Sequence, residues 1–169
     1  MSTFRNPAVD VHLILRRNGA VLLAQRAGSY GHGQWAMPCG KVEPAEPVPL
    51  AAVRELAEET GLIVSRDQIK LAHTVHAMSD DGLEQEHLGF FFAVHHWVGE
   101  PRLAEPSKCM EQRWWPLDAL PAQLMPYSAY GLARALEDPG GMSLFGWGER
   151  TESAAAAAAR DLPMLDVGH

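Results

Sequence analysis

Apolar and polar positions near the start of the chain predict a β-hairpin. The run VDVHLILR covers residues 9–16 and VLLAQR covers residues 21–26, with Asn18-Gly19 between them. Both central residues of a tight hairpin turn need positive φ, which Asn and Gly adopt readily. The next segment, AGSYGHGQWAMPCG, carries four glycines and a proline without a sustained period. We expect a loop there, with a short strand at residues 34–37.

The spacing of apolar residues changes to a helical period between residues 47 and 60. Prolines at positions 47 and 49 fit only a first helical turn, and Gly61 stands where a C-terminal cap belongs. Four apolar side chains share one face of the helical wheel: Leu50, Val53, Leu56 and Ala57. Three acids share the opposite face: Glu55, Glu58 and Glu59. We therefore expect a helix that buries its apolar side and exposes three carboxylates.

The second half of the chain predicts further strands and one more helix. Strand-like runs cover residues 71–78, 86–97 and 113–117, with a turn at residues 80–82. A closing helix is expected at residues 127–137, ended by Pro-Gly-Gly. Strands and helices mixed in this order favour an α/β sandwich around a mixed sheet.

The domain is expected to span residues 1–140, and residues 141–169 to form a tail. Six alanines in the tail, at residues 154–159, favour a helix, but so short a run is marginal in water. We expect this tail to be flexible, or helical when docked on a partner subunit, which makes a homodimer plausible.

The charge balance limits the class of ligand. The chain has 21 acidic residues against 14 lysines and arginines, which argues against binding polymeric nucleic acid. A small phosphate compound remains compatible if a divalent cation reverses the local charge. The two cysteines predict neither a disulfide scaffold nor a zinc site. Without a signal-like start or a long apolar run, we expect a cytoplasmic protein that does not span a membrane.

One segment carries the candidate chemistry. GKVEPAEPVPLAAVRELAEETGL, from Gly40 to Leu62, resembles the Nudix box: Gly, five residues, Glu, seven residues, then Arg-Glu-apolar-x-Glu-Glu-x-Gly-apolar. The flanking runs QRAGSYGHGQWAMPCGKVEP, FFFAVHHWVGEP and RWWPLDALP are similar to the MutT-like branch of this family. The resemblance covers roughly residues 9–136 and implies an α/β/α sandwich with a mixed β-sheet between helices.

The box assigns metal and catalytic roles. Three carboxylates at i, i+3 and i+4 repel one another, so a compensating cation is expected, and Mg²⁺ is the oxygen-preferring candidate. A solvated acidic helix face is the alternative reading. The resemblance implies that Glu55, Glu58 and Glu59 bind Mg²⁺, or Mn²⁺ in its place, and activate water. It also implies that the carbonyl of Gly40 binds metal and that Arg54 orients a glutamate, although a plain surface arginine is the alternative.

Residues outside the box are candidates for metal and substrate binding. Many relatives add one more metal-binding glutamate, for which Glu111 is our first choice and Glu105 the second; a solvated loop acid is the alternative. Arg26, Trp35 and Trp114 are the candidates for substrate binding, since aromatic faces stack on any nucleobase. Core packing is the competing interpretation for each tryptophan.

These features predict a Mg²⁺-dependent hydrolase of a diphosphate linkage in a nucleoside di- or triphosphate, for example an oxidised purine nucleotide, which releases a nucleoside monophosphate. The first alternative is another X-linked diphosphate, such as a nucleotide sugar, ADP-ribose or an isoprenoid diphosphate. The second is a sensor that binds a nucleotide without cleaving it, since fold does not determine function. Loss of box carboxylates would be expected in a sensor, and here all are present.

Overall fold

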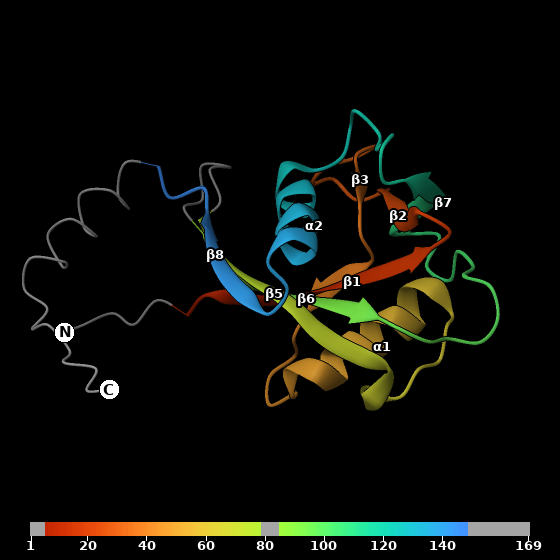
Figure 1. The fold of residues 1–169 in the computed structure, drawn as a ribbon, viewed down its shortest axis with the longest axis horizontal. Coiled ribbons are helices and arrows are strands. Elements are labelled where there is room, and N and C mark those ends of the chain that lie inside the picture. Colours follow the sequence, from red (N-terminus) through yellow and green to blue (C-terminus); the bar gives the residue numbers. More distant parts are fainter. Residues whose placement is uncertain (1–5, 79–84, 149–169) are drawn as a thin grey trace, which may run out of the picture.

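A mixed sheet lies between two helices in the computed structural model, which describes residues 6–78 and 85–148 (Figure 1). The strands of the first half are β1 (Ala8–Arg17), β2 (Ala20–Arg26), β3 (Trp35–Ala36) and β4 (Cys39–Lys41). Those of the second half are β5 (Ile69–Met78), β6 (Glu86–Val94), β7 (Cys109–Pro116) and β8 (Gly141–Phe145). The helices are α1 (Val48–Thr60) and α2 (Pro126–Glu137), with a short 3₁₀ turn at Arg66–Gln68.

The predicted hairpin is present at the predicted turn. β1 and β2 pair antiparallel, and Asn18 and Gly19 between them have φ of 49° and 74°. On its other edge β1 runs parallel to β6, while β6 and β5 are antiparallel. The path through the sheet is β3-β2-β1-β6-β5-β8, with β4 added to β1 and β7 to β2. The sheet is therefore mixed, as expected.

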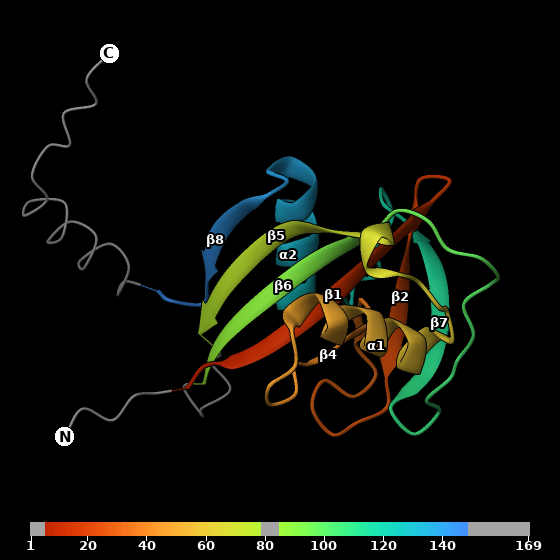
Figure 2. The same cartoon turned by 90° about the horizontal axis from the view of Figure 1, so that it is seen from below.

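Alternating side chains of the central strands form two cores, one on each face of the sheet. Leu13 and Phe92 belong to the core beneath α1, whereas Ile14 and Phe91 belong to the core beneath α2. Figure 2 shows α1 on the near side of the sheet and α2 behind it. Because neighbouring strand residues point to opposite faces, each strand supplies both cores. The predicted α/β/α sandwich is confirmed.

The predicted end of the domain at residue 140 is too early. Residues 141–145 form β8, which pairs in parallel with β5. A strand of five residues after Pro-Gly-Gly has too weak a pattern to be recognised without its partner strand, which lies about 70 positions earlier. The turn expected at residues 80–82 and the alanine run at 154–159 lie outside the described residues.

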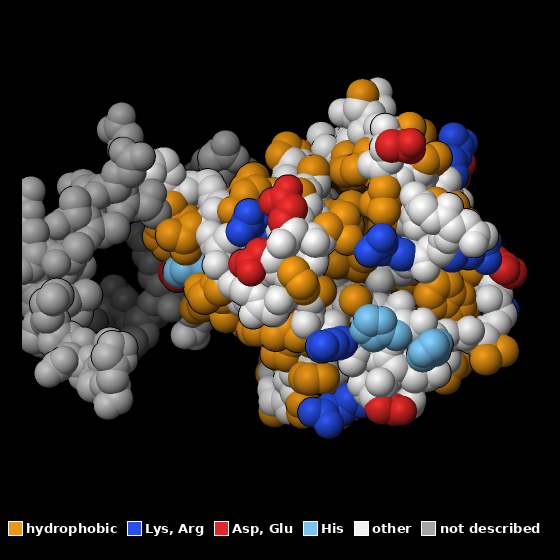
Figure 3. All heavy atoms as spheres, in the orientation of Figure 1, with side chains coloured by type: hydrophobic (Ala, Val, Ile, Leu, Met, Phe, Trp, Pro, Cys, Tyr) orange, Lys and Arg blue, Asp and Glu red, His pale blue; other side chains and the backbone are white. Residues whose placement is uncertain are grey.

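Two features of the surface bear on the ligand class and on membrane insertion. Within residues 6–78 and 85–148, no helix is long and apolar enough to cross a membrane. On the face shown in Figure 3, acidic and basic side chains are interspersed among apolar ones, without an extended basic area.

Close packing of α2 on β6 gives a stability prediction. A Cβ added at Gly131 would lie 2.0 Å from Cζ of Phe91, so Gly131→Ala must displace the ring. Overpacking of this kind costs about 1–3 kcal/mol, more than the ~1 kcal/mol that alanine gains over glycine in a helix. We expect urea denaturation to show a lower free energy of unfolding. Gly28→Ala, where an added Cβ meets nothing within 4 Å, is the matched control. Equal stability of both variants would contradict the packing.

Candidate active site

The acidic side of α1 is turned partly into the protein. The buried residues of the helix are Ala51, Ala52, Glu55, Leu56 and Thr60. Glu55 is only 7% exposed, Glu59 is half-buried and Glu58 is exposed, whereas Leu50 is 49% exposed. The wheel prediction was therefore wrong for Leu50 and Glu55. A helical period shows which residues share a face, but the contacts of α1 with β4 and β1 decide which face is covered.

Glycine at position 40 allows Glu55 to approach β4. A Cβ at Gly40 would lie 1.9 Å from Cδ of Glu55, so any side chain there would displace the carboxylate. β4 is anchored by antiparallel pairing with β1, where Gly40 stands opposite Val11. The predicted metal-binding backbone of Gly40 and the predicted carboxylate of Glu55 are thus brought together.

Arg54 connects the acids of the box. Its Nε and Nη2 donate to the two carboxylate oxygens of Glu46, each at 2.8 Å. Its Nη1 donates to Glu55 at 2.7 Å and to Glu58 at 3.2 Å, and Nη2 also reaches the carbonyl of Lys41 at 3.1 Å. The hydrogen bonds to Glu46, and then those to Glu55, raise the pKa of Arg54. The same hydrogen bonds between Arg54 and Glu46 lower the pKa of Glu46 to about 2. The guanidinium therefore orients Glu55 through a two-point hold on Glu46.

Glu59 is a desolvated carboxylate. Its Oε2 accepts a hydrogen bond of 3.1 Å from the backbone N–H of Cys39. Burial is the main cause that raises its pKa to about 8; the Cys39 hydrogen bond lowers this pKa, and the charges of Glu55 and Glu105 add smaller increases. Burial also raises the pKa of Glu55 against the opposing effect of Arg54. Two acids of the box are thus short of positive charge.

The two candidates for an additional glutamate have different surroundings. Glu111, the first choice, is held by Arg113 with an Nη2–Oε1 distance of 2.6 Å. Glu105, the second choice, lies near enough to Glu59 for its charge to raise that pKa. Oε1 of Glu105 pairs with Lys108 at 2.8 Å, whereas its Oε2 is buried without a hydrogen-bond partner among the described residues. The structure therefore associates Glu105, rather than Glu111, with the box.

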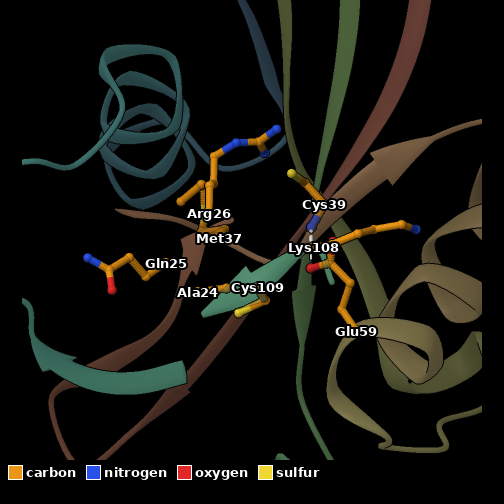
Figure 4. Close-up of a pocket in the computed structure, with 9 residues that line it drawn as sticks. Ala24, Gln25, Arg26, Met37, Cys39, Glu59, Lys108 and Cys109 are labelled. Carbon is orange, nitrogen blue, oxygen red and sulfur yellow. Dashed lines mark hydrogen bonds between the residues drawn. The ribbon is translucent and has the colours of Figure 1, made fainter. Parts of the chain in front are cut away.

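A hollow beside these acids contains further candidate residues. It is shallow, and its empty volume of about 250 Å³ includes space open to solvent. Figure 4 shows the Cys39 N–H directed at Glu59, and Arg26 and Lys108 also line the hollow. Arg26 is held by a 3.0 Å hydrogen bond from its Nε to the carbonyl of Tyr30. A carboxylate and two cations thus line one hollow.

Neither predicted tryptophan lines this hollow. Trp35 is 5% exposed and packs edge-on against Trp115, with ring centroids 5.3 Å apart. Trp114 stacks on Trp97 at 6.1 Å, and the guanidinium of Arg17 lies 4.3 Å from its ring centroid. The ring of Trp114 is therefore already in contact with Trp97 and Arg17. Trp35 is packed in the core, as the competing interpretation proposed. Sequence reasoning did not select Lys108 or Cys39 as site residues, although Cys39 is adjacent to Gly40 and Lys108 lies between Glu105 and Glu111.

The donor set fits a divalent cation. Among the described residues, no group of three His, Cys, Asp or Glu side chains is placed so that it could hold a metal ion. One of the acids, Glu55, accepts a hydrogen bond from Arg54 instead. However, the unpartnered Oε2 of Glu105 and the raised pKa values of Glu55 and Glu59 show uncompensated acidic oxygens in one region. Hard oxygen ligands of this kind suit Mg²⁺.

A match to the NUDIX domain model covers residues 4–136 of the chain. The chain belongs to the Nudix hydrolase family. A MutT NUDIX hydrolase from Burkholderia pseudomallei has a similar structure, with a TM-score of 0.70 and 29% identity over 76% of this chain and 98% of that one. These agreements place the chain in the MutT-like branch.

Two curated relatives of this Nudix chain differ in the activity for which they are named. An ADP-ribose pyrophosphatase of Methanocaldococcus jannaschii is 31% identical over 70% of this chain and 67% of its own length. An oxidized purine nucleoside triphosphate hydrolase of Danio rerio is 32% identical over 63% of this chain and 65% of its own length. The matches thus span about two thirds of each relative.

Arg54 gives a prediction about stability. Lysine cannot reproduce its two-point hydrogen bonding to Glu46, so we expect Arg54→Lys to lose about 1–2 kcal/mol of stability. Arg17→Lys is the matched control, since Arg17 also holds both oxygens of a glutamate, Glu100, whose side chain is 70% exposed. Exposed pairs contribute at most about 1 kcal/mol. Chemical denaturation measures both, and an equal or larger loss in Arg17→Lys would contradict the role of Arg54.

Glu59→Gln should alter stability in a pH-dependent way. The pKa of Glu59 rises from 4.5 to about 8 on folding, so the folded chain binds more protons than the unfolded chain between these values. Wild-type stability therefore falls as pH rises through that window, whereas glutamine cannot ionise. Without divalent cations, we expect melting temperatures to be similar near pH ~4 and higher for Glu59→Gln near pH ~9. Glu58→Gln, on the exposed side of α1, is the control, and parallel pH profiles for Glu59→Gln and wild type would contradict the desolvation.

Proposed function

We propose that the chain uses Mg²⁺ to hydrolyse a diphosphate linkage in a nucleoside di- or triphosphate and releases a nucleoside monophosphate. The observation that carries this proposal is the group of desolvated or unpartnered carboxylates, Glu55, Glu59 and Glu105, beside a hollow with two cations. A bound Mg²⁺, or Mn²⁺ in its place, supplies Lewis-acid polarisation of phosphate oxygens and lowers the pKa of bound water.

The side chains divide the work by their surroundings. Glu59, Glu105 and the Gly40 backbone are the proposed ligands, together with the exposed carboxylate of Glu58. Glu55, which is buried and held by a hydrogen bond from Arg54, is the proposed general base. Glu111 has no place in this set, because it is paired with Arg113.

Two cations on the wall of the hollow suit the phosphates. Arg26 and Lys108 line the hollow together with Glu59. Their positive charges attract a phosphate chain, while the carboxylates reach the same phosphates through the divalent cation. This arrangement favours small anionic substrates over polymeric nucleic acid and agrees with a cytoplasmic nucleotide hydrolase. All the proposed residues come from one chain, so the site is complete without the second subunit of the expected homodimer.

ADP-ribose is the second candidate substrate. It contains the same diphosphate linkage, and the relative from Methanocaldococcus jannaschii is named for it. The residues proposed to face the phosphates do not distinguish ADP-ribose from a nucleoside di- or triphosphate, since either substrate would place a diphosphate beside Glu59. A binding-only sensor is disfavoured, because such a protein has no need for desolvated acids that raise one another's pKa.

The direct test is a hydrolysis screen with and without Mg²⁺. It covers nucleoside triphosphates, oxidised nucleotides, nucleotide sugars and ADP-ribose, with products identified by mass spectrometry. A nucleoside monophosphate released only with a divalent cation supports the proposal. Nucleotide binding without hydrolysis of any compound would instead favour the sensor.

Glu105 and Glu111 provide a matched pair for the metal assignment. We expect Glu105→Gln to lower kcat/KM by more than about tenfold and to weaken the rise in melting temperature caused by Mg²⁺. Glu111→Gln removes an equal charge from a glutamate held by Arg113, and we expect less than a threefold change, about 0.6 kcal/mol. The reverse order of the two variants would restore Glu111 as the ligand and remove Glu105 from the site.

A further inference from the structure

The C-terminal end of α1, which carries Glu59, is held by two other segments of the chain. The last carbonyls of a helix have no partner within the helix and must be satisfied from elsewhere. Here the carbonyl of Thr60 accepts a 2.9 Å hydrogen bond from the N–H of Arg102. The carbonyl of Glu59 accepts two, one of 2.7 Å from Nε2 of Gln112 and one of 3.3 Å from the N–H of Ala104. Helix α1, the loop at residue 104 and strand β7 therefore meet at this carbonyl (Figure 2).

Gln112 reaches the carbonyl from the face of β7 that is turned toward α1. In the pairing of β2 with β7, Gln112 stands opposite Ala24, and Trp114 stands opposite Leu22. Leu22 belongs to the core beneath α1. Because alternate residues of a strand share a face, Ala24 and Gln112 face α1 as well. Ala24 lines the hollow, so the amide lies next to a residue of the candidate site.

The side chain supplies the stronger of the two hydrogen bonds to the Glu59 carbonyl. Such N–H···O bonds normally span about 2.7–3.2 Å, so the bond from Gln112 is at the short end, whereas the bond from Ala104 is long. Only the amide nitrogen of a glutamine can donate, which fixes the orientation of this amide. Without Gln112, the carbonyl would keep only the long bond from Ala104.

Stability alone does not account for this amide. Its Oε1 is buried and has no hydrogen-bond partner in the part of the chain that the structure describes. An unsatisfied buried acceptor costs at least as much free energy as one hydrogen bond contributes, so the amide adds little net stability. We therefore looked to the geometry that the bond imposes.

The same contacts determine where Glu105 lies relative to Glu59. Ala104, which donates to the Glu59 carbonyl, directly precedes Glu105. The carbonyl of Glu105 accepts from the N–H groups of Lys108 and Cys109, each at 3.0 Å, where β7 begins. The backbone at Glu105 is thus tied to α1 on one side and to β7 on the other. Gln112 joins the same two elements directly and so closes a ring of contacts.

We propose that Gln112 is a positioning residue that fixes the separation of Glu59 and Glu105 and thereby raises the affinity of the site for a divalent cation. This inference rests on the proposed function, because it takes both glutamates as metal ligands. Gln112 contacts neither metal nor substrate and acts through the backbone carbonyl of Glu59. Residues that orient metal ligands in this way commonly change metal affinity by about 10–100-fold.

Binding of Mn²⁺ to the nucleotide-free protein tests the role of Gln112 without any hydrolysis. Electron paramagnetic resonance counts the free Mn²⁺ at each total concentration and so gives the dissociation constant. Gln112→Met keeps the length of the side chain but removes the N–H, and we expect the dissociation constant to rise at least about fivefold. An unchanged constant, or a wild-type protein that binds no Mn²⁺, would overturn the proposal.

Gln112→Asn tests the reach of the amide. It keeps both polar groups but is one methylene shorter, so its nitrogen falls short of the carbonyl, and we expect it to bind Mn²⁺ as weakly as Gln112→Met does. Wild-type affinity in Gln112→Asn would overturn the proposal, because a polar group without the hydrogen bond would then suffice.

Ser143→Ala is the control for a general loss of stability. It removes the 2.9 Å hydrogen bond between Ser143 Oγ and Nε2 of buried His73, and it lies on β8 at the far edge of the sheet. We expect a lower melting temperature but a Mn²⁺ dissociation constant within about 1.5-fold of wild type, since distant sites act independently. A loss of affinity equal to that in Gln112→Met would overturn the positioning role.

The dependence of hydrolysis on Mg²⁺ separates positioning from a direct part in the reaction. For Gln112→Met we expect the Mg²⁺ concentration at half-maximal activity to rise at least about fivefold, while kcat at saturating Mg²⁺ stays within about threefold of wild type. A lower kcat with an unchanged Mg²⁺ requirement would overturn the proposal. If the wild type hydrolyses nothing but Gln112→Met still weakens Mn²⁺ binding, the proposed function is rejected and the role of Gln112 stands.

Discussion

The close contact between α1 and β4 is the constraint on which the site depends. Glu55 occupies the volume that a side chain at position 40 would fill, so the helix can approach the strand only over glycine. This approach removes water from Glu55 and Glu59. Arg54 donates a hydrogen bond to Glu55 and so stabilises its negative charge. Burial consequently raises the pKa of both acids, and a divalent cation would favour their ionised forms.

Adjacent residues of strand β4 face the two sides of the sheet. Its Gly40 faces α1 and the box acids, while its Cys39 faces α2 and the hydrogen-bonded side chains of Asp10 and His12. The backbone N–H of Cys39 also binds Glu59, so the same short strand contacts residues on both sides.

Buried polar groups in this protein fall into two kinds. His73 on β5 is fully buried, and both of its ring nitrogens have partners, the carbonyl of Asp138 and the hydroxyl of Ser143. It needs no explanation beyond the fold. His12 and Glu105 differ, because each leaves one buried atom unpartnered.

Local rules were sufficient for much of this structure. Asn18-Gly19 formed the predicted turn, and Gly61, with φ of 70°, capped α1 where its position in the sequence indicated. The spacing of the box residues likewise indicated which side chains would gather. Each of these depends on neighbours within a few positions, where backbone preferences and helical spacing decide the outcome.

Contacts between distant segments were decided only by the tertiary structure. β8 is a strand because β5 lies beside it, and Glu105 joins the box because its loop returns to Glu59. The burial of Glu55 and the meeting of Asp10 with His87 and Tyr127 have the same origin. The sequence alone determined the family, the main elements and the box; packing determined which acids are desolvated and which polar atoms lack partners, because burial depends on residues that are remote along the chain.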